Sequence, residues 1–292
     1  MRSRSDSGQP KRSTDRPQTE HPQCDRGHCQ KGLYIVGIGP GALDHLSVRA
    51  RQVLSGADTV VGYGTYVDLI RPLIKGKEII STGMTKEVER VAAALAAAMS
   101  GSAVALVSSG DPGIYAMAGL AFEMCVQRRI DVIPAGDFLA DTEKPSLRIE
   151  VVPGIPALCA GAALLGAPLT HDFAAISLSD LLTPWDVIEK RIIAAAQADF
   201  VMVIYNPKSR KRNWQLQKTR EIVLGYRDGH TPVGIVTAAM RPEQVVHITT
   251  LDQLHLADVN MQTTVFIGNS STCASAGFMF TPRGYGKKYA IG

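Results

Sequence analysis

The sequence predicts an α/β protein of two domains with mainly parallel sheets and a cleft between the domains. Short runs rich in β-branched residues alternate with longer runs of helical character. The apolar residues of the strand-like runs are continuous rather than alternating, which is typical of strands that are buried on both faces. A Gly-, Ala- and Pro-rich break at residues 166–172 then divides this pattern into two halves.

The elements follow in order along the chain. The predicted strands cover residues 33–38, 59–61, 104–108, 149–152, 174–178, 200–205, 233–236 and 264–267. The predicted helices cover residues 47–55, 86–99, 114–127, 156–165, 184–196 and 213–224. Ser47 and Thr183 are expected to cap helices, because a hydroxyl oxygen accepts hydrogen bonds from first-turn amides. Pro156 and Pro184 suit the first helical turn, where an N–H has no partner within the helix.

We place the domains at residues 32–168 and 169–292, with an exposed insertion at residues 130–147 before the fourth strand of the first domain. Residues 1–31 hold almost no apolar side chains and are expected to form a disordered basic tail. Within this tail, His21, Cys24, His28 and Cys29 are possible metal ligands. Their spacing is not that of a zinc finger, so we expect no metal.

Charge and composition exclude several classes of protein. The 292 residues are 45% hydrophobic, yet no apolar run approaches the roughly 18–20 residues that cross a bilayer. The basic N-terminal segment lacks the apolar stretch of a secretory signal, and five cysteines suit reduced thiols, so we expect a cytoplasmic protein that binds no membrane. The net charge is +4, and most of it lies in the tail. A nearly neutral body disfavours a broad nucleic-acid surface.

Three glycine-rich turns follow predicted strands, at residues 37–42, 108–115 and 151–157. The first satisfies G-x-G-x-x-A, but the helical pattern begins only near Ser47 and Asp58 precedes the second strand, which departs from a dinucleotide-binding loop. Each turn has a purely structural interpretation, and Asp111 could simply cap a helix. Three such turns at strand ends nevertheless predict one shared ligand site.

A basic segment, residues 208–212, follows the predicted strand that ends at Tyr205. It could bind carboxylates or phosphates, or it could be a solvated loop. The zincin, P-loop and nucleophile-elbow motifs are absent from the sequence, which disfavours the commonest hydrolases and nucleotidases.

Six segments together resemble the tetrapyrrole methylases. They are residues 36–41, 61–66, 82–84, 109–115, 152–157 and 177–185, and the resemblance extends over residues 32–286. The glycine motifs are shared throughout that family. Residues 62–63, 83–84 and 179–185 are most similar to the members that methylate C17 of precorrin-3B, or of its cobalt form, in cobalamin biosynthesis.

The resemblance implies the two-domain fold of the class III S-adenosylmethionine (SAM) methyltransferases, with SAM as methyl donor in the cleft, a tetrapyrrole substrate and a homodimer. The implied donor contacts are Pro40, Gly110, Asp111, Ile114, Tyr115, Ala157, Tyr205, Asn206, Ala239 and Thr264. The implied substrate contacts are Tyr63, Met84 and Ser179, with Lys208, Arg210 and Arg212 for the carboxylates of the macrocycle.

These relatives also contract the macrocycle as C17 is methylated, which requires proton transfer. Asp111 and His171 are the candidates, because both are expected to face the cleft. His171 could equally anchor the segment between the domains. Four other functions stay open. Two are enzymes of the same fold, which would methylate another position of a tetrapyrrole or a nucleic acid. The others are nicotinamide-dependent reduction at the first glycine turn, and a noncatalytic module that binds SAM or, through the basic tail, nucleic acid.

Overall fold

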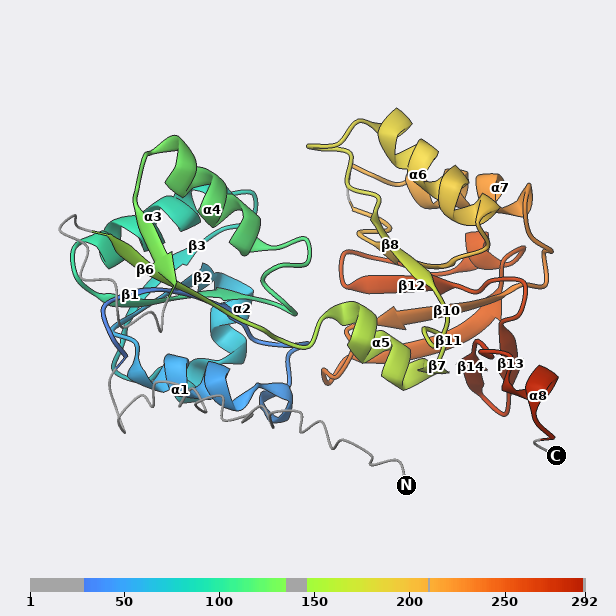
Figure 1. Cartoon of the computed structure of the whole chain (residues 1–292), viewed down its shortest axis with the longest axis horizontal. Helices are drawn as coiled ribbons and strands as arrows, with labels where there is room; N and C mark the ends of the chain where they lie inside the picture. Colours follow the sequence, from blue (N-terminus) through green and yellow to red (C-terminus); the bar gives the residue numbers. More distant parts are fainter. Residues whose placement is uncertain (1–28, 135–145, 210, 291–292) are drawn as a thin grey trace, which may run out of the picture.

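The computed structural model describes residues 29–134, 146–209 and 211–290. It has two lobes, which lie side by side in Figure 1. We call residues 29–152 the N-terminal lobe and residues 157–290 the C-terminal lobe. The expected disorder of residues 1–28, most of the predicted insertion, and the residues His21, Cys24, His28 and Arg210 lie outside the described residues.

The N-terminal lobe contains a six-stranded sheet of order β3-β2-β4-β1-β6-β5 in which every neighbouring pair is parallel. Its strands are β1 (Gly32–Gly37), β2 (Thr59–Tyr63), β3 (Glu78–Thr82), β4 (Ala103–Ser108), β5 (Val132–Pro134) and β6 (Leu147–Val152). The central strands β1 and β4 are buried along their whole length, as their continuous apolar sequences predict. All strands therefore end at the same edge of the sheet.

Helices cover both faces of this sheet. They are α1 (Val48–Gly56), α2 (Gly64–Leu69), α3 (Glu87–Met99) and α4 (Met117–Gln127). Helix α1 packs on the face that carries Tyr34 and Val36, whereas α3 and α4 pack on the face that carries Leu33 and Ile35. Successive residues of a strand point to opposite faces, so each face of β1 has its own core.

Ser47 is the N-cap of α1, and its Oγ accepts a hydrogen bond from the backbone N–H of Ala50 at 3.1 Å. The predicted cap is confirmed. We expect Ser47→Ala to lower the free energy of unfolding by about 1 kcal/mol, because the first turn loses this acceptor. Chemical denaturation measures the change, and an unaltered midpoint with an unaltered slope would contradict it.

The C-terminal lobe contains a five-stranded sheet of order β11-β10-β12-β9-β8. Its strands are β8 (Phe173–Ser177), β9 (Val201–Tyr205), β10 (Pro232–Thr237), β11 (Val245–Thr250) and β12 (Thr263–Ile267). Only β8 and β9 are parallel; the other pairs are antiparallel. The prediction of mainly parallel sheets is thus confirmed for the first lobe and wrong for the second, because the connections from β10 to β12 contain no crossover helix.

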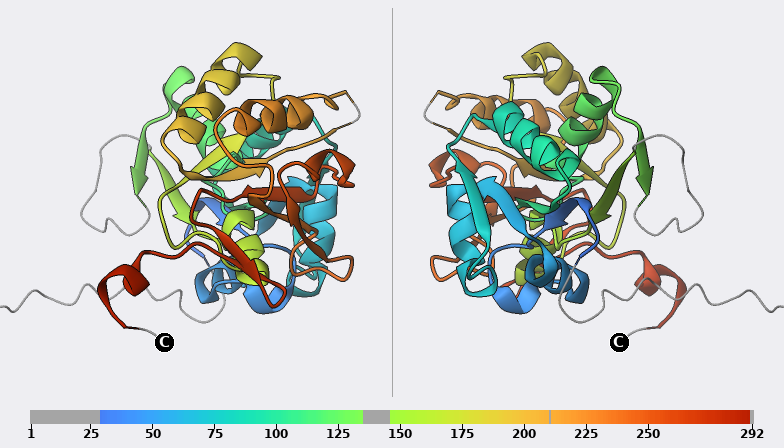
Figure 2. Two further views of the ribbon diagram at one scale, coloured as in Figure 1. Left: turned by 90° about the vertical axis from the view of Figure 1, so that its right-hand side faces the viewer. Right: turned by 90° about the vertical axis from the view of Figure 1, so that its left-hand side faces the viewer.

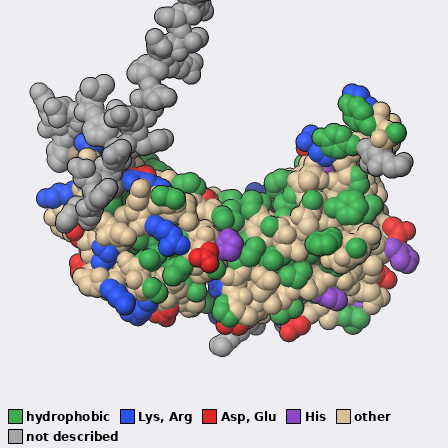
Figure 3. All heavy atoms as spheres, turned by 90° about the horizontal axis from the view of Figure 1, so that it is seen from below, with side chains coloured by type: hydrophobic (Ala, Val, Ile, Leu, Met, Phe, Trp, Pro, Cys, Tyr) green, Lys and Arg blue, Asp and Glu red, His purple; other side chains and the backbone are tan. Residues whose placement is uncertain are grey.

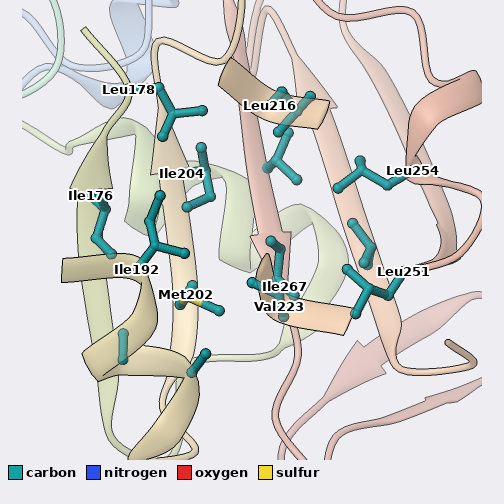
Figure 4. Packing of buried hydrophobic residues seen from close by; sticks show 14 of the residues in the cluster. Ile176, Leu178, Ile192, Met202, Ile204, Leu216, Val223, Leu251, Leu254 and Ile267 are labelled. Carbon is teal, nitrogen blue, oxygen red and sulfur yellow. The ribbon is translucent and has the colours of Figure 1, made fainter. Parts of the chain in front are cut away.

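Helices α6 (Trp185–Gln197) and α7 (Gln215–Leu224) cover one face of the second sheet. Figure 4 shows Ile192 of α6 near Ile176 and Met202, and Val223 of α7 near Ile267. Pro184 is the N-cap of α6, with no side-chain acceptor, so the predicted cap at Thr183 is wrong. Pro156 likewise lies at the N-cap of its helix, one position before the first turn.

Helix α5 (Ala157–Leu165) covers the opposite face, where Leu158 and Leu165 pack with Phe266. Directly after it, β7 (Gly166–Ala167) joins β13 (Cys273–Ser275) and β14 (Phe278–Phe280) in a three-stranded sheet. The predicted domain boundary after residue 168 is therefore too late: the chain enters the second lobe before α5. The glycine at position 166 begins a strand of this small sheet instead of a linker.

The remaining elements are short. They are α8 (Tyr285–Lys288) and the 3₁₀ helices Leu43–His45, Arg71–Leu73 and Leu254–Leu256. Figure 2 shows α8 at the margin of the molecule, away from both main sheets. At the other end of the described chain, the backbone N–H of Cys29 donates to the carbonyl of Gly56, so this last part of the predicted tail packs beside α1. The described residues include no helix long and apolar enough to cross a membrane.

Candidate functional site

A cavity of about 480 Å³ lies between the lobes, and its wall is formed by residues of both. The outline of the molecule narrows between the lobes in Figure 3. The volume is within the range of about 300–1,000 Å³ that is usual for sites of small organic ligands. Strands β1, β2, β4 and β9 all end at this cavity, so it lies where ligands bind in open α/β sheets.

The three glycine turns meet at this edge of the first sheet, backbone against backbone. Gly39 and Gly110 exchange two hydrogen bonds, of 3.1 and 2.8 Å, and both have positive φ angles. A Cβ atom added to Gly154 would lie 2.1 Å from the carbonyl oxygen of Gly110, and one added to Gly37 would lie 2.6 Å from the nitrogen of Gly154. Only glycine fits at these two positions.

Asp111 joins the second and third of these turns. Its Oδ1 accepts a hydrogen bond from the backbone N–H of Gly113 (2.8 Å), and its Oδ2 accepts one from the backbone N–H of Gly154 (3.1 Å). Helix α4 begins only at Met117, so Asp111 does not cap it. Asp111 lines the cavity as expected, but both of its oxygens already hold the loops together. Its part in proton transfer stays a prediction.

Two tyrosines link the lobes at the cavity. The Tyr115 hydroxyl, from the N-terminal lobe, donates to the carbonyl of Ala175 on β8 at 2.9 Å. The Tyr115 and Tyr205 rings are tilted against each other, with centroids 5.1 Å apart. The Tyr205 hydroxyl accepts a hydrogen bond from the backbone N–H of Leu158 (2.9 Å), in the first turn of α5, where the N-cap residue Pro156 offers no side-chain acceptor.

Burial raises the pKa of Tyr205 to about 12, so its hydroxyl stays protonated near neutral pH. The folded state therefore holds this proton more tightly than the unfolded chain, in which the pKa of tyrosine is about 10. We expect the free energy of unfolding to fall as pH rises from about 10 to about 12. We also expect Tyr205→Phe to cost about 1–3 kcal/mol near neutral pH, because the buried N–H of Leu158 loses its acceptor, and to reduce the alkaline fall.

Thermal and chemical denaturation against pH, with tyrosinate absorbance, measure both effects. Tyr226→Phe is the matched control, since Tyr226 is exposed at the end of α7. An equal loss of stability in the two variants would contradict the capping role of Tyr205.

Every residue predicted to contact the donor lines this one cavity: Pro40, Gly110, Asp111, Ile114, Tyr115, Ala157, Tyr205, Asn206, Ala239 and Thr264. Of the predicted substrate contacts, Tyr63 and Met84 also line it. The structure thus brings together segments from six of the predicted strand ends. Their roles in binding stay predictions.

Other predicted substrate contacts lie outside the cavity wall. Arg212 is 5% exposed and lies behind the wall, where its Nε donates to the carbonyl of Asn206 (3.1 Å) and a terminal nitrogen lies 3.5 Å from the Ser179 hydroxyl. Arg212 therefore supports Asn206 from behind, and neither Arg212 nor Ser179 lines the cavity. Lys208 borders a separate hollow of about 90 Å³ beside α7.

The expectation that His171 faces the cleft is wrong. His171 precedes β8 and therefore lies at the amino end of that strand, whereas the cavity lies at the carboxyl end. Its Nδ1 accepts a hydrogen bond from the backbone N–H of Asp172 (2.9 Å), a local contact within the C-terminal lobe, so the structure does not support the alternative that His171 anchors a segment between the domains.

Two arginines in the cavity wall were missed. Arg241 follows β10, and its guanidinium crosses to the N-terminal lobe, where it donates to the Pro40 carbonyl (2.7 Å) and to the Ser109 hydroxyl (3.3 Å). Arg90 lies on α3 and is 4% exposed. The position of Arg241 just after a predicted strand was a usable signal. Nothing in the sequence separates Arg90 from an arginine on the solvated face of a helix.

The described residues contain no cluster of His, Cys, Asp and Glu side chains suited to a metal ion. The cavity wall instead offers aromatic rings, two guanidinium groups and the exposed backbone of the glycine turns. Such a site binds and orients an organic ligand.

Comparison with known proteins agrees with this geometry. The sequence model of the family described as "Tetrapyrrole (Corrin/Porphyrin) Methylases" matches residues 32–255. The chain belongs to this family. The predicted tetrapyrrole methylase fold and the predicted enzyme class, a methyltransferase, are both confirmed. The expectation of a nicotinamide-dependent reductase is thereby set aside.

Within this family, the chain is similar to several curated relatives and solved structures. The chain is 46% identical over 259 residues to the "Cobalt-factor III methyltransferase" of Priestia megaterium, of which it spans 46%. It is 44% identical over 253 residues to the "Probable cobalt-factor III C(17)-methyltransferase" of Salmonella typhimurium, of which it spans 99%. These alignments cover 89% and 87% of the chain. Among solved structures, the methyltransferase CobJ superposes with a TM-score of 0.76 at 36% identity, over 86% of this chain and 99% of that one.

Proposed function

We propose that this enzyme transfers the methyl group of SAM to C17 of cobalt-factor III, or of its metal-free counterpart precorrin-3B, and contracts the ring in the course of cobalamin biosynthesis. The observation that carries the proposal is the single cavity in which every predicted donor contact meets Tyr63 and Met84. The names of relatives 46% and 44% identical to the chain favour the cobalt-containing substrate.

The cavity fits SAM as the donor. A Cβ at Gly37 or Gly154 would overlap the neighbouring turn, so the glycines let the turns pack closely. This packing brings Pro40, Gly110 and Ala157 together in the cavity wall. A family member of the same fold from Thermus thermophilus, 21% identical, was solved in complex with S-adenosylhomocysteine. SAM would supply an electrophilic methyl group, and the residues around the glycine turns would hold it.

In this reaction the protein positions the donor and the substrate and excludes water from the cavity. Transfer requires the sulfur, the methyl carbon and the attacking carbon in line, and two lobes that close on both ligands fix that geometry. Tyr115 and Arg241 link the lobes on the two sides of the glycine turns, so they would limit how far the cavity opens. The electron-rich macrocycle carbon attacks directly, and no protein nucleophile is needed.

The proposal includes a cytoplasmic homodimer, as the family resemblance implies. Sedimentation equilibrium of the purified chain tests the dimer: a concentration-independent monomer would overturn this part alone.

Anaerobic incubation of the purified protein with SAM and cobalt-factor III, in parallel with precorrin-3B, tests the activity. We expect a product heavier by one methyl group, with the visible spectrum of a contracted ring. Nuclear magnetic resonance of the product with a labelled methyl donor gives the position. A methyl at another carbon would favour a different specificity within the family, and no methylation of either macrocycle would overturn the proposal.

A further inference from the structure

We propose that Arg90 is the binding site for a carboxylate of the macrocyclic substrate, at the end of the cavity that Tyr63, Tyr66, Met84 and Glu87 line. The inference rests on the proposed function for the identity of the ligand. It rests on the structure for the site itself, which is a buried, unpaired guanidinium in the cavity wall.

The N-terminal lobe forms this end of the cavity from the segments after β2 and β3 and from the first turn of α3. The Tyr63 and Tyr66 rings meet edge to face with centroids 5.2 Å apart, and the Arg90 guanidinium lies 5.9 Å from the centroid of Tyr63. Met84 and Glu87 also line this end of the cavity. No predicted donor contact belongs to this group, so this end is available to the second ligand.

Arg90 is fixed from behind. Its Nε donates to the Thr82 hydroxyl (2.7 Å), and one terminal nitrogen donates to the carbonyl of Gly83 (2.8 Å). The other terminal nitrogen has only the thioether sulfur of Met117, at 3.8 Å. A guanidinium carries five N–H groups, so several of them have no strong acceptor in the described part of the chain.

The charge of Arg90 also lacks a partner. Among the described residues it forms no ion pair, although only 4% of its surface is exposed. Of the other two deeply buried arginines, Arg227 lies 3.9 Å from a carboxylate oxygen of Asp199, whereas Arg212 forms no ion pair with a described residue and donates to the carbonyl of Asn206 instead. Buried charges in proteins are normally paired. A ligand carboxylate in the cavity would supply the missing partner, in the two-pronged geometry that a guanidinium offers.

Corrin precursors carry acetate and propionate side chains, so the matching chemistry is a polycarboxylate macrocycle. Glu87 lines the same end of the cavity, and its carboxylate would repel such a ligand. Neutralising Glu87 therefore tests whether the charge at this end controls binding. Arg90 would then fix the orientation of the ring relative to the donor, and so contribute to the choice of the carbon that is methylated.

The test compares Arg90→Gln, Arg90→Lys and the matched control Arg71→Gln, an exposed arginine outside the cavity. The probe is uroporphyrin, a porphyrin with carboxylate side chains, titrated by fluorescence alongside the same ring with its carboxylates converted to amides. We expect Arg90→Gln to weaken uroporphyrin binding by about tenfold or more and to leave the affinities for the amide probe and for SAM within about twofold. The affinity of Arg90→Lys for uroporphyrin should lie between those of the unaltered protein and of Arg90→Gln. Glu87→Gln should bind uroporphyrin more tightly than the unaltered protein.

Equal affinity of Arg90→Gln and Arg71→Gln for uroporphyrin would overturn the inference. So would an equal loss for the amide probe, which would mean that Arg90 only supports the wall, and so would the absence of uroporphyrin binding by the unaltered protein. Thr82→Val removes one support of Arg90 but keeps its charge, and it should retain binding if the charge is what matters. Methylation of cobalt-factor III is scored separately: binding without methylation would overturn the proposed function and leave this site standing.

Discussion

Gly154→Ala should cost the enzyme its affinity for the methyl donor. The added Cβ would lie 2.1 Å from the Gly110 carbonyl oxygen and within 2.9 Å of the Gly37 backbone, so the turns after β1, β4 and β6 must separate. Overpacking typically costs about 1–3 kcal/mol, and here backbone atoms on both sides leave little room to relax. We expect donor affinity, measured by calorimetry, to fall by at least about tenfold, with a lower melting temperature.

Gly119→Ala is the matched control. Gly119 lies within α4, and a Cβ there meets nothing within 4 Å, so this change should raise stability by about 0.5–1 kcal/mol through helix propensity. Donor affinity should be unchanged. If Gly154→Ala bound SAM as tightly as Gly119→Ala does, the contact of the three turns would not be what shapes the donor site.

Arg241→Gln should loosen the link between the lobes and reduce kcat/KM by about 10–100-fold. The guanidinium makes two hydrogen bonds to the opposite lobe, at Pro40 and Ser109, and its side chain fills the space next to Gly41. Hydrogen bonds that involve a charged group contribute about 1.5–3 kcal/mol each. Small-angle scattering should show a larger radius of gyration in the variant, and calorimetry should show weaker donor binding.

Ser109→Ala removes only the longer of these two bonds, so its effect should be clearly smaller than that of Arg241→Gln. Arg241→Lys keeps the charge but can reach fewer acceptors, and we expect an intermediate rate. A normal radius of gyration with a normal rate in Arg241→Gln would show that Tyr115 and the packing of the lobes hold the cavity closed without it.

Patterns of apolar residues were sufficient to predict the buried strands and the helices that cover them. Strands without such a pattern were missed: β3 and β11 lie at the edges of their sheets and are largely half-buried or exposed, so their sequences carry no continuous apolar run. The parallel pairing of the second sheet was wrong for a related reason. Apolar continuity reports burial on both faces, and antiparallel strands covered by α5 on one side and α6 and α7 on the other satisfy it equally well.

The glycine turns after β1, β4 and β6 could be predicted from local sequence, and the family resemblance supplied the other expected donor contacts; all of them line the cavity, and their contact with a donor stays a prediction. The substrate side depends on which side chains reach the cavity across long distances in sequence. Arg212 resembled a free basic group but is enclosed behind Asn206, whereas Arg90 resembled a surface residue but lines the cavity. Only tertiary packing separates these two cases.

Because the three turns meet mainly through main-chain atoms, their side chains other than Asp111 are under little constraint from that contact. Homologues can therefore diverge at the intervening positions and still keep the same donor pocket. A library that randomises those positions while holding Gly37, Gly39, Gly110, Asp111 and Gly154 constant should yield a high fraction of folded variants. That makes the turns a practical starting place for altering which sulfonium analogue the enzyme accepts.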